Sequence, residues 1–205
     1  MSHQEQLPVH PGKSELLVAC ALKQESTALQ GRLQVDCRFL VTGLGAHRTR
    51  KSLESTFQSE PPSLLIFTGT AGQLDPSLGL GQVVFPEEWC LKDGSCFPAD
   101  ADLTSMLREG DGWEIEGRGL TVSTAVLRAK SRLALYRKFG ARICDMESAF
   151  ALQVASRYGV PCLAPKIVSD TAQSGISVFW REFDSNMDQL AKYLDNLIAS
   201  IIKGR

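Results

Sequence analysis

The sequence lacks the features that mark several large classes of protein. Its six cysteines form no CxxC pair and have no histidine close enough to complete a zinc set. No apolar run approaches the about 20 residues of a membrane-spanning helix, and residues 1–15 lack the apolar centre of a secretory signal. We therefore expect a soluble cytoplasmic protein whose cysteines are all reduced thiols: Cys20, Cys37, Cys90, Cys96, Cys144 and Cys162.

The charge balance is equally plain. The 22 basic and 23 acidic residues leave a formal charge of −1, which creates no broad field for nucleic acid or an anionic membrane. A small-molecule partner is the remaining expectation. The 205 residues, of which 43% are apolar, suffice for one domain with a continuous core, here residues 15–205 behind a flexible N-terminal tail at 1–14.

Short apolar runs alternate with longer mixed segments, which is typical of an α/β fold. Pro165 would remove one ladder hydrogen bond, so an edge or a bulge is expected there. The glycine-rich segment 68–72 is expected to form a turn after a buried strand. Strands are predicted over 15–22, 37–45, 63–68, 79–91, 119–127 and 160–170, and helices over 24–33, 46–58, 103–110, 130–140 and 184–203. The segment 141–159 is predicted to begin as a strand and to become a long helix that ends at Gly159.

Polar residues follow several of these strands, where ligands bind in α/β sheets. Glu25, Glu147 and Asp170 come from distant segments and are expected to converge on one cavity. TGTAG at 68–72 either cradles an anion or a sugar hydroxyl or is only a tight turn, and it has neither the P-loop lysine nor dinucleotide spacing. Arg48 either reaches a phosphate or carboxylate or is a solvated charge.

Three motifs in order make the pattern specific. They are TGTAG-x-LDPSLGLGQVV at 68–84, DMESA at 145–149 and GVP-x₇-SD at 159–170. From Glu15 onward the chain resembles the superfamily of purine nucleoside phosphorylases and methylthioadenosine/S-adenosylhomocysteine nucleosidases, and DMESA resembles its hopanoid-associated phosphorylase branch. The resemblance implies a single-domain phosphorylase/hydrolase-like fold, with a central mixed twisted sheet flanked by helices.

The resemblance also implies roles for the acidic residues. Asp170 matches the acid that supplies or stabilises the proton at purine N7, as cleavage from ribose C1′ leaves negative charge on the base; otherwise it caps a segment. Glu147 matches the residue that accepts hydrogen bonds from the ribose 2′ and 3′ hydroxyls. The alternative is that it is only an acidic residue placed favourably near a helix N-terminus. Glu25 aligns with the base that activates water, although Lys23 and Gln24 replace family acids and an exposed helix position is the alternative.

The remaining site residues are expected around these acids. Met146 is expected either to form an apolar wall against the sugar or to pack in the core. Phe179 or Trp180 is expected to close over the base or the 5′ substituent as an aromatic lid, and Leu127 to lie near the base. Thr70, Ala71 and Gly72 would line the pocket for sugar and nucleophile, and Gly45, Arg48 and Thr70 would hold phosphate in a phosphorylase.

Departures from the family pattern leave base and 5′ specificity open. Lys166 stands where relatives often carry arginine, which weakens any bidentate pairing. Residues 91–118 are shorter than usual and lack an Arg-His loop, and Thr124 and Ala125 replace Gly-Asp.

Three functions follow from the sequence. They are hydrolysis of an adenosine-type nucleoside with a modified 5′ position, phosphorolysis of the same bond with inorganic phosphate as co-substrate, and nucleoside binding without turnover. No metal or organic cofactor is expected. A homodimer is expected, because relatives complete the pocket with a neighbour's residues.

Overall fold

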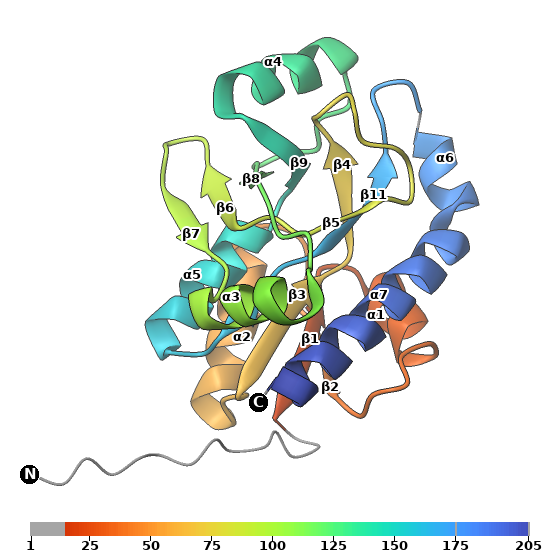
Figure 1. Ribbon diagram of the computed structural model, residues 1–205. Coiled ribbons are helices and arrows are strands. Elements are labelled where there is room, and N and C mark those ends of the chain that lie inside the picture. Colours follow the sequence, from red (N-terminus) through yellow and green to blue (C-terminus); the bar gives the residue numbers. More distant parts are fainter. Residues whose placement is uncertain (1–14, 175, 205) are drawn as a thin grey trace, which may run out of the picture.

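The computed structural model describes residues 15–174 and 176–204, and the expected tail at 1–14 lies outside them. Strands and helices alternate along this part of the chain, so the predicted α/β class with a mixed sheet flanked by helices is confirmed (Figure 1). Within those two ranges, none of the helices combines the length and apolar character that a bilayer crossing requires.

Eleven strands are described. They are β1 (Leu16–Cys20), β2 (Arg38–Val41), β3 (Leu64–Thr68), β4 (Thr70–Gln73), β5 (Val83–Val84), β6 (Glu88–Leu91), β7 (Cys96–Pro98), β8 (Arg118–Thr121), β9 (Ala141–Asp145), β10 (Cys162–Leu163) and β11 (Lys166–Asp170).

The described helices are α1 (Lys23–Gln30), α2 (Ala46–Ser59), α3 (Ala101–Asp111), α4 (Ala129–Phe139), α5 (Ser148–Tyr158), α6 (Ile176–Arg181) and α7 (Phe183–Gly204). The sequence patterns did not predict β7 or α6.

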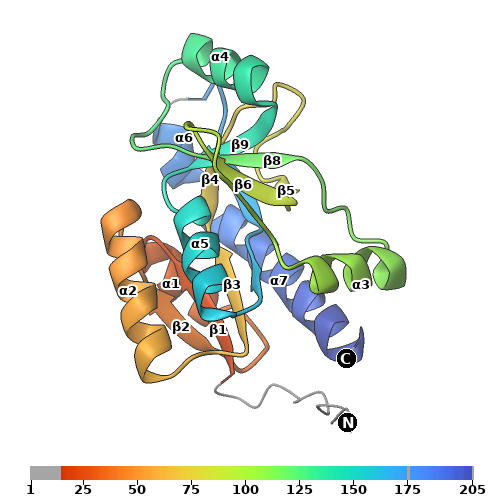
Figure 2. The ribbon, with the colours of Figure 1, turned by 90° about the vertical axis from the view of Figure 1, so that its left-hand side faces the viewer.

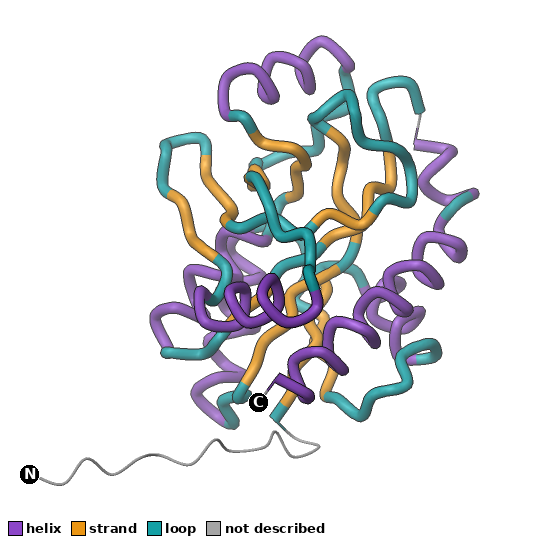
Figure 3. Tube along the Cα trace, in the orientation of Figure 1, coloured by secondary structure: helices purple, strands orange, loops and turns teal. Residues whose placement is uncertain are grey.

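The strands form two hydrogen-bonded sheets at the centre of the molecule (Figure 3). The smaller has the order β10-β3-β1-β2 and is parallel throughout, and the larger has the mixed order β5-β11-β4-β9-β8-β6-β7. The chain returns to the smaller sheet through α5, between β9 and β10, and it crosses between the sheets without an intervening helix twice, between β3 and β4 and between β10 and β11. These two crossings bring the ends of both sheets together at one place.

Two sequence expectations need correction at these crossings. TGTAG is not a turn: Thr70 to Gln73 form strand β4, parallel to β11, and only Gly69 interrupts the run, at φ 124°. The single strand expected over 160–170 is divided at Pro165, because proline has no N–H to continue the ladder. The strand expected over 79–91 is likewise divided, into β5 and β6.

Helices cover the sheets on opposite sides. Leu53 and Phe57 of α2 pack in one core cluster with Ala151 and Leu152 of α5. A second cluster joins α1, α3 and the long α7, whose buried positions recur at helical spacing. Figure 2 shows α2 and α5 side by side, with α3 beside α7 on the other side of the strands.

A close contact links strands β6 and β8. The Trp89 side chain is completely buried, and its Nε1 donates a hydrogen bond to the Ala164 carbonyl oxygen at 3.2 Å. Gly119 lies directly opposite Trp89 in the register of the two strands. A Cβ atom at position 119 would overlap the indole ring, so the ring occupies the space that only glycine leaves free.

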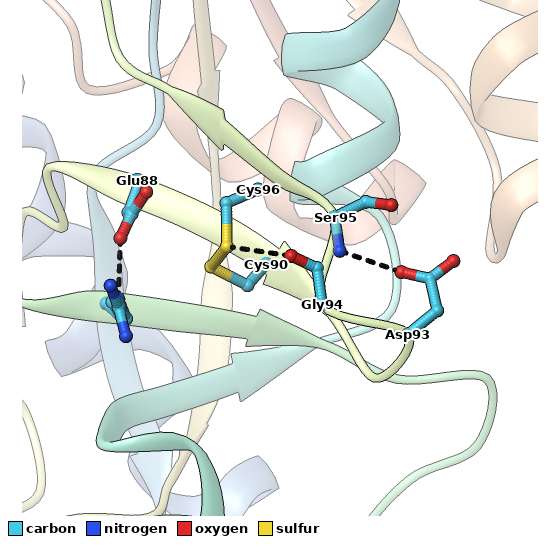
Figure 4. The surroundings of a disulfide bond; sticks show 7 residues. Glu88, Cys90, Asp93, Gly94, Ser95 and Cys96 are labelled. Atoms are coloured by element: carbon cyan, nitrogen blue, oxygen red, sulfur yellow. Dashed lines mark hydrogen bonds and ion pairs between the residues drawn. A yellow bond between two sulfur atoms is a disulfide. The ribbon is translucent and has the colours of Figure 1, made fainter.

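The expectation of six reduced thiols is wrong for two cysteines. Cys90 and Cys96 face each other across the antiparallel β6–β7 hairpin and form a disulfide (Figure 4). Sequence spacing did not reveal this, because the hairpin that pairs them was not predicted. The cytoplasmic location expected together with reduced thiols stays a prediction. The described free thiols are Cys20, Cys37, Cys144 and Cys162.

The Trp89–Gly119 contact yields a stability prediction. Gly119→Ala is expected to lower the free energy of unfolding by about 1–3 kcal/mol, because the added methyl forces the indole ring to move in a packed core. Urea denaturation measures this. Gly110→Ala is the matched control, since Gly110 is an exposed helical glycine where an added Cβ would meet nothing within 4 Å, and it should be neutral or stabilising by up to about 1 kcal/mol. Equal stability of the two variants would refute the packing argument.

Candidate active site

A cavity of about 430 Å³ lies where the two sheets meet. Its walls come from the β1–α1 connection, β4, β11, the β9–α5 connection, the segment around α4, and α6. Ten site residues predicted from the sequence line it: Glu25, Thr70, Ala71, Gly72, Leu127, Met146, Glu147, Asp170, Phe179 and Trp180.

Glu25 lines this cavity and is held by several hydrogen bonds. Its side chain accepts hydrogen bonds from Thr70 N at 2.8 Å, from Thr70 Oγ1 at 2.7 Å and from Leu22 N at 3.2 Å. Glu25 is only 2% exposed, which excludes the alternative of a solvated helix position. A Cβ atom on Gly69 would lie 2.8 Å from the Glu25 carboxylate, so glycine is needed there for this close approach as well as for its positive φ.

Glu147 approaches the cavity from the start of α5. Its carboxylate accepts hydrogen bonds from Gly45 N at 2.7 Å and Met146 N at 3.2 Å. Burial raises the pKa of Glu147 to about 7, and the neighbouring charge of Asp145 adds to the increase. The group therefore changes protonation state near neutral pH.

Asp145 and Lys166 form a buried pair behind Glu147. Lys166 Nζ lies 3.4 Å from Asp145 Oδ2 and donates a hydrogen bond to the Thr68 carbonyl oxygen at 3.1 Å. Asp145 also accepts hydrogen bonds from Thr121 Oγ1 at 2.8 Å and Ser148 N at 3.0 Å. Lys166 thus contributes one ammonium contact, where an arginine could have offered a two-pronged one.

Asp170 ends strand β11 and is engaged at both carboxylate oxygens. Ser169 Oγ donates to Oδ1 at 3.0 Å, and the Arg132 guanidinium pairs with Oδ2. Gly72 lies opposite, and a Cβ atom there would come 3.2 Å from Arg132 Nη1 and 3.4 Å from Asp170 Oδ2. The side chain of Asp170 is 24% exposed, so it is the most accessible of the acids in the cavity.

The opening of the cavity is apolar. Leu127 is 69% exposed and Trp180 57% exposed, and both line the cavity together with Leu44 and Phe179. Phe179 and Trp180 meet edge to face, with ring centroids 4.8 Å apart. Both aromatic residues proposed as a lid are therefore at the cavity, on helix α6.

Two residues predicted for phosphate binding do not line this cavity. Gly45 contributes its N–H to Glu147 and lies on a neighbouring cavity of about 320 Å³. Arg48 is exposed on α2, and its side chain runs past Gly43, where a Cβ atom would lie 3.0 Å from Arg48 Cδ. The solvated alternative fits this position of Arg48 better than a contact with a ligand in the cavity.

The sulfur atoms of the described residues are poorly suited to chemistry in the cavity. Cys144 lines it, but burial raises the pKa of this thiol to about 12, so it is a poor nucleophile. Among the described residues, Glu88, Cys90 and Cys96 bring potential metal ligand atoms within 4.8 Å of one another, and the disulfide of Figure 4 occupies both sulfur atoms.

Arg132 is a charged residue of the cavity that sequence reasoning missed. It lies on α4, where the sequence shows one arginine among several charged residues, and no local signal distinguishes it. Asp145 did carry a signal, because it stands at the end of a predicted strand, where polar residues of ligand sites gather in α/β folds.

Comparison with known proteins agrees with this arrangement. The phosphorylase superfamily matches residues 22–203 of the chain. The 5′-methylthioadenosine/S-adenosylhomocysteine nucleosidase of Bacillus cytotoxicus is 25% identical over 186 residues, 80% of this chain and 79% of the relative. The protein of the same name from Staphylococcus saprophyticus is 23% identical over 197 residues, 85% of each chain.

Solved structures show the same fold. The Helicobacter pylori 5′-methylthioadenosine/S-adenosylhomocysteine nucleosidase with butyl-thio-DADMe-Immucillin-A has a TM-score of 0.79 at 15% identity, covering 90% of this chain and 97% of that chain. The futalosine hydrolase of Helicobacter pylori strain 26695 has a TM-score of 0.77 at 16% identity, covering 90% and 97%. Since the family match extends from the first helix to the last, this chain belongs to the phosphorylase superfamily.

Proposed function

We propose that this protein is an N-ribosyl hydrolase, which uses water to cleave the N-glycosidic bond of a purine nucleoside. One observation carries the proposal: Glu25, Glu147 and Asp170 come from three distant segments and line the same cavity. Relatives named as nucleosidases cover most of the chain and support the same reaction.

Each carboxylate suits one part of the reaction. Glycosidic cleavage makes C1′ cationic and the departing base anionic. Asp170, the most accessible acid, would supply or stabilise the proton at N7 of the base. Glu147 would accept hydrogen bonds from the ribose hydroxyls, against the apolar wall of Met146. Glu25, oriented by Thr70, would take a proton from the attacking water.

The charges in the cavity favour water over phosphate. Lys166 and Arg132 are the two cationic side chains that line it in the described part of the chain, and both already pair with carboxylates. The N–H of Thr70, which an anion would need, is bonded to Glu25. A phosphate ion would therefore meet buried negative charge without a free cation.

The apolar opening suggests the type of substrate. Leu44, Leu127 and Trp180 leave apolar surface exposed at the cavity mouth, which fits a 5′ position that carries an alkyl or thioalkyl group. We therefore propose an adenosine-type nucleoside with a modified 5′ group as the substrate.

The function is tested with a nucleoside panel in phosphate-free buffer. We expect release of free adenine from 5′-methylthioadenosine and 5′-alkylated adenosines, with the corresponding 5-substituted ribose as the second product. Asp170→Asn should lower turnover by at least ~10², on the scale of general acid catalysis.

The matched control is Asp188→Asn, an exposed aspartate on α7 outside the cavity, which should behave as the parent. Base release that requires added phosphate, with a sugar 1-phosphate as product, would replace hydrolysis by phosphorolysis. Ligand binding without any base release would leave only a binding protein.

The raised pKa of Glu147 predicts a pH dependence of substrate capture. Below about pH 7 this carboxyl becomes protonated and accepts hydroxyl hydrogen bonds less well, so kcat/KM should fall by up to about tenfold per pH unit. Glu147→Gln should have lower kcat/KM at pH 8 and lack this acid limb. A limb that persists unchanged in the variant would assign it to another group.

The same shift predicts a stability effect of opposite direction. The folded-state pKa of Glu147 is raised. Its favourable contribution to the free energy of unfolding is therefore fully present below about pH 4.5 and is lost as pH rises through about 7. Glu147→Gln should therefore gain free energy of unfolding relative to the parent between pH 5 and pH 8. Chemical denaturation at the two pH values measures this, and a difference that does not grow with pH would contradict the burial argument.

We also propose that two copies of the chain associate, since the apolar residues at the cavity mouth would be covered by a second copy. Light scattering tests this, and a monomer at assay concentration would end the proposal.

A further inference from the structure

Helix α4 reaches the cavity through one charged side chain. Arg132 is the single residue of α4 that is fully buried, while Leu135, Tyr136 and Phe139 are only partly buried against the core beneath them. Its guanidinium Nη1 donates hydrogen bonds to the carbonyl oxygens of Gln73 at 3.0 Å and Asp170 at 3.1 Å. The same guanidinium pairs with the Asp170 carboxylate through Nη2.

Burying the guanidinium of Arg132 costs free energy, because the charged group loses its contact with water. The side chain of Arg132 is 5% exposed, and its Nε is a buried donor with no hydrogen-bond partner among the described residues. A buried ion pair contributes little net stability and often less than an apolar replacement. An apolar side chain at this position of α4 would pack the helix against the core without the free-energy cost of burying a charge. The presence of a guanidinium instead indicates that it serves the site.

The contacts fix the orientation of Asp170. The guanidinium and the Ser169 hydroxyl occupy one lone pair on each carboxylate oxygen, which prevents the carboxyl group from rotating. The carboxyl group therefore lines the cavity in one fixed orientation.

We propose that Arg132 is a positioning residue that holds the carboxyl group of Asp170 in the orientation needed to supply or stabilise the proton at N7 of the departing purine. The inference rests on the proposed function for the identity of the leaving group. The proton that reaches N7 comes ultimately from solvent and is supplied or stabilised by Asp170. The electron pair of the bond from C1′ to the base moves onto the purine, which leaves as the neutral N7–H form. A water oxygen bonds to C1′, and Glu25 passes the proton of that water back to solvent.

Substitution of Arg132 tests this through the leaving group. Arg132→Met should lower kcat for purine nucleosides by ~10², the range seen when a proton-handling group is lost. Cleavage of 4-nitrophenyl riboside should change less than about threefold, because nitrophenolate departs without protonation. Arg132→Lys, which keeps the charge but not the planar fork, should lie between Arg132→Met and the parent. Arg137→Met, an exposed arginine on the same helix, is the matched control and should match the parent.

A double-mutant cycle separates positioning from a merely structural role. If Arg132 acts through Asp170, adding Arg132→Met to Asp170→Asn should lower kcat for purine nucleosides by less than about threefold. The same substitution in the parent should lower kcat by ~10². Circular dichroism and thermal melting show whether each variant is folded, and Arg132→Lys serves for the cycle if Arg132→Met is not.

The inference would be overturned if Arg132→Met lowered kcat equally in the parent and in Asp170→Asn. It would also be overturned if Arg132→Met lowered kcat equally for purine nucleosides and for the nitrophenyl riboside. All assays are run with and without phosphate. A strict need for phosphate would refute the proposed hydrolysis and leave the inference intact, because it concerns only how the base departs. Normal purine turnover by Arg132→Met, with an active parent, would refute the inference and leave the function intact.

Discussion

The site depends on pairing several carboxylates that would otherwise repel one another in a single cavity. Glu25 has the N–H and hydroxyl of Thr70, Asp145 has Lys166, and Asp170 has Arg132. Glu147 has two backbone N–H groups but no cation in direct contact among the described residues, and its pKa is the one that rises to about 7. The protein thus gives three of these acids a cation or paired donors, and burial leaves Glu147 able to titrate near neutral pH.

The fold supplies these partners by changing sheets at the cavity. Gly69 lets the backbone pass from β3 to β4 while the Glu25 carboxylate lies against it. Pro165 ends the β10 ladder, and β11 then carries Lys166, Ser169 and Asp170 along the cavity wall. Both junctions are needed, because each brings acids and donors that are distant in sequence to the same few ångströms of space.

Sequence reasoning predicted the features that depend on local pattern. Apolar runs placed the strands, and the acids after them pointed to Glu25, Glu147 and Asp170. It was wrong where a tertiary contact decided the outcome. TGTAG has the composition of a turn, yet pairing with β11 makes it a strand. Cys90 and Cys96 looked unpaired until a hairpin placed them face to face. Arg132 carried no signal, because only the packing of α4 shows which arginine of that segment points inward.

The two sheet crossings also bear on how the molecule comes apart. Since β3 continues into β4 and β10 is followed at once by β11, two strands of the smaller sheet are joined directly to two strands of the larger one. The cavity therefore exists only while both sheets are intact, and the chain is built to unfold as one cooperative unit. A ligand bound at the junction would protect amides in both sheets from hydrogen exchange, including those far from any contact with it.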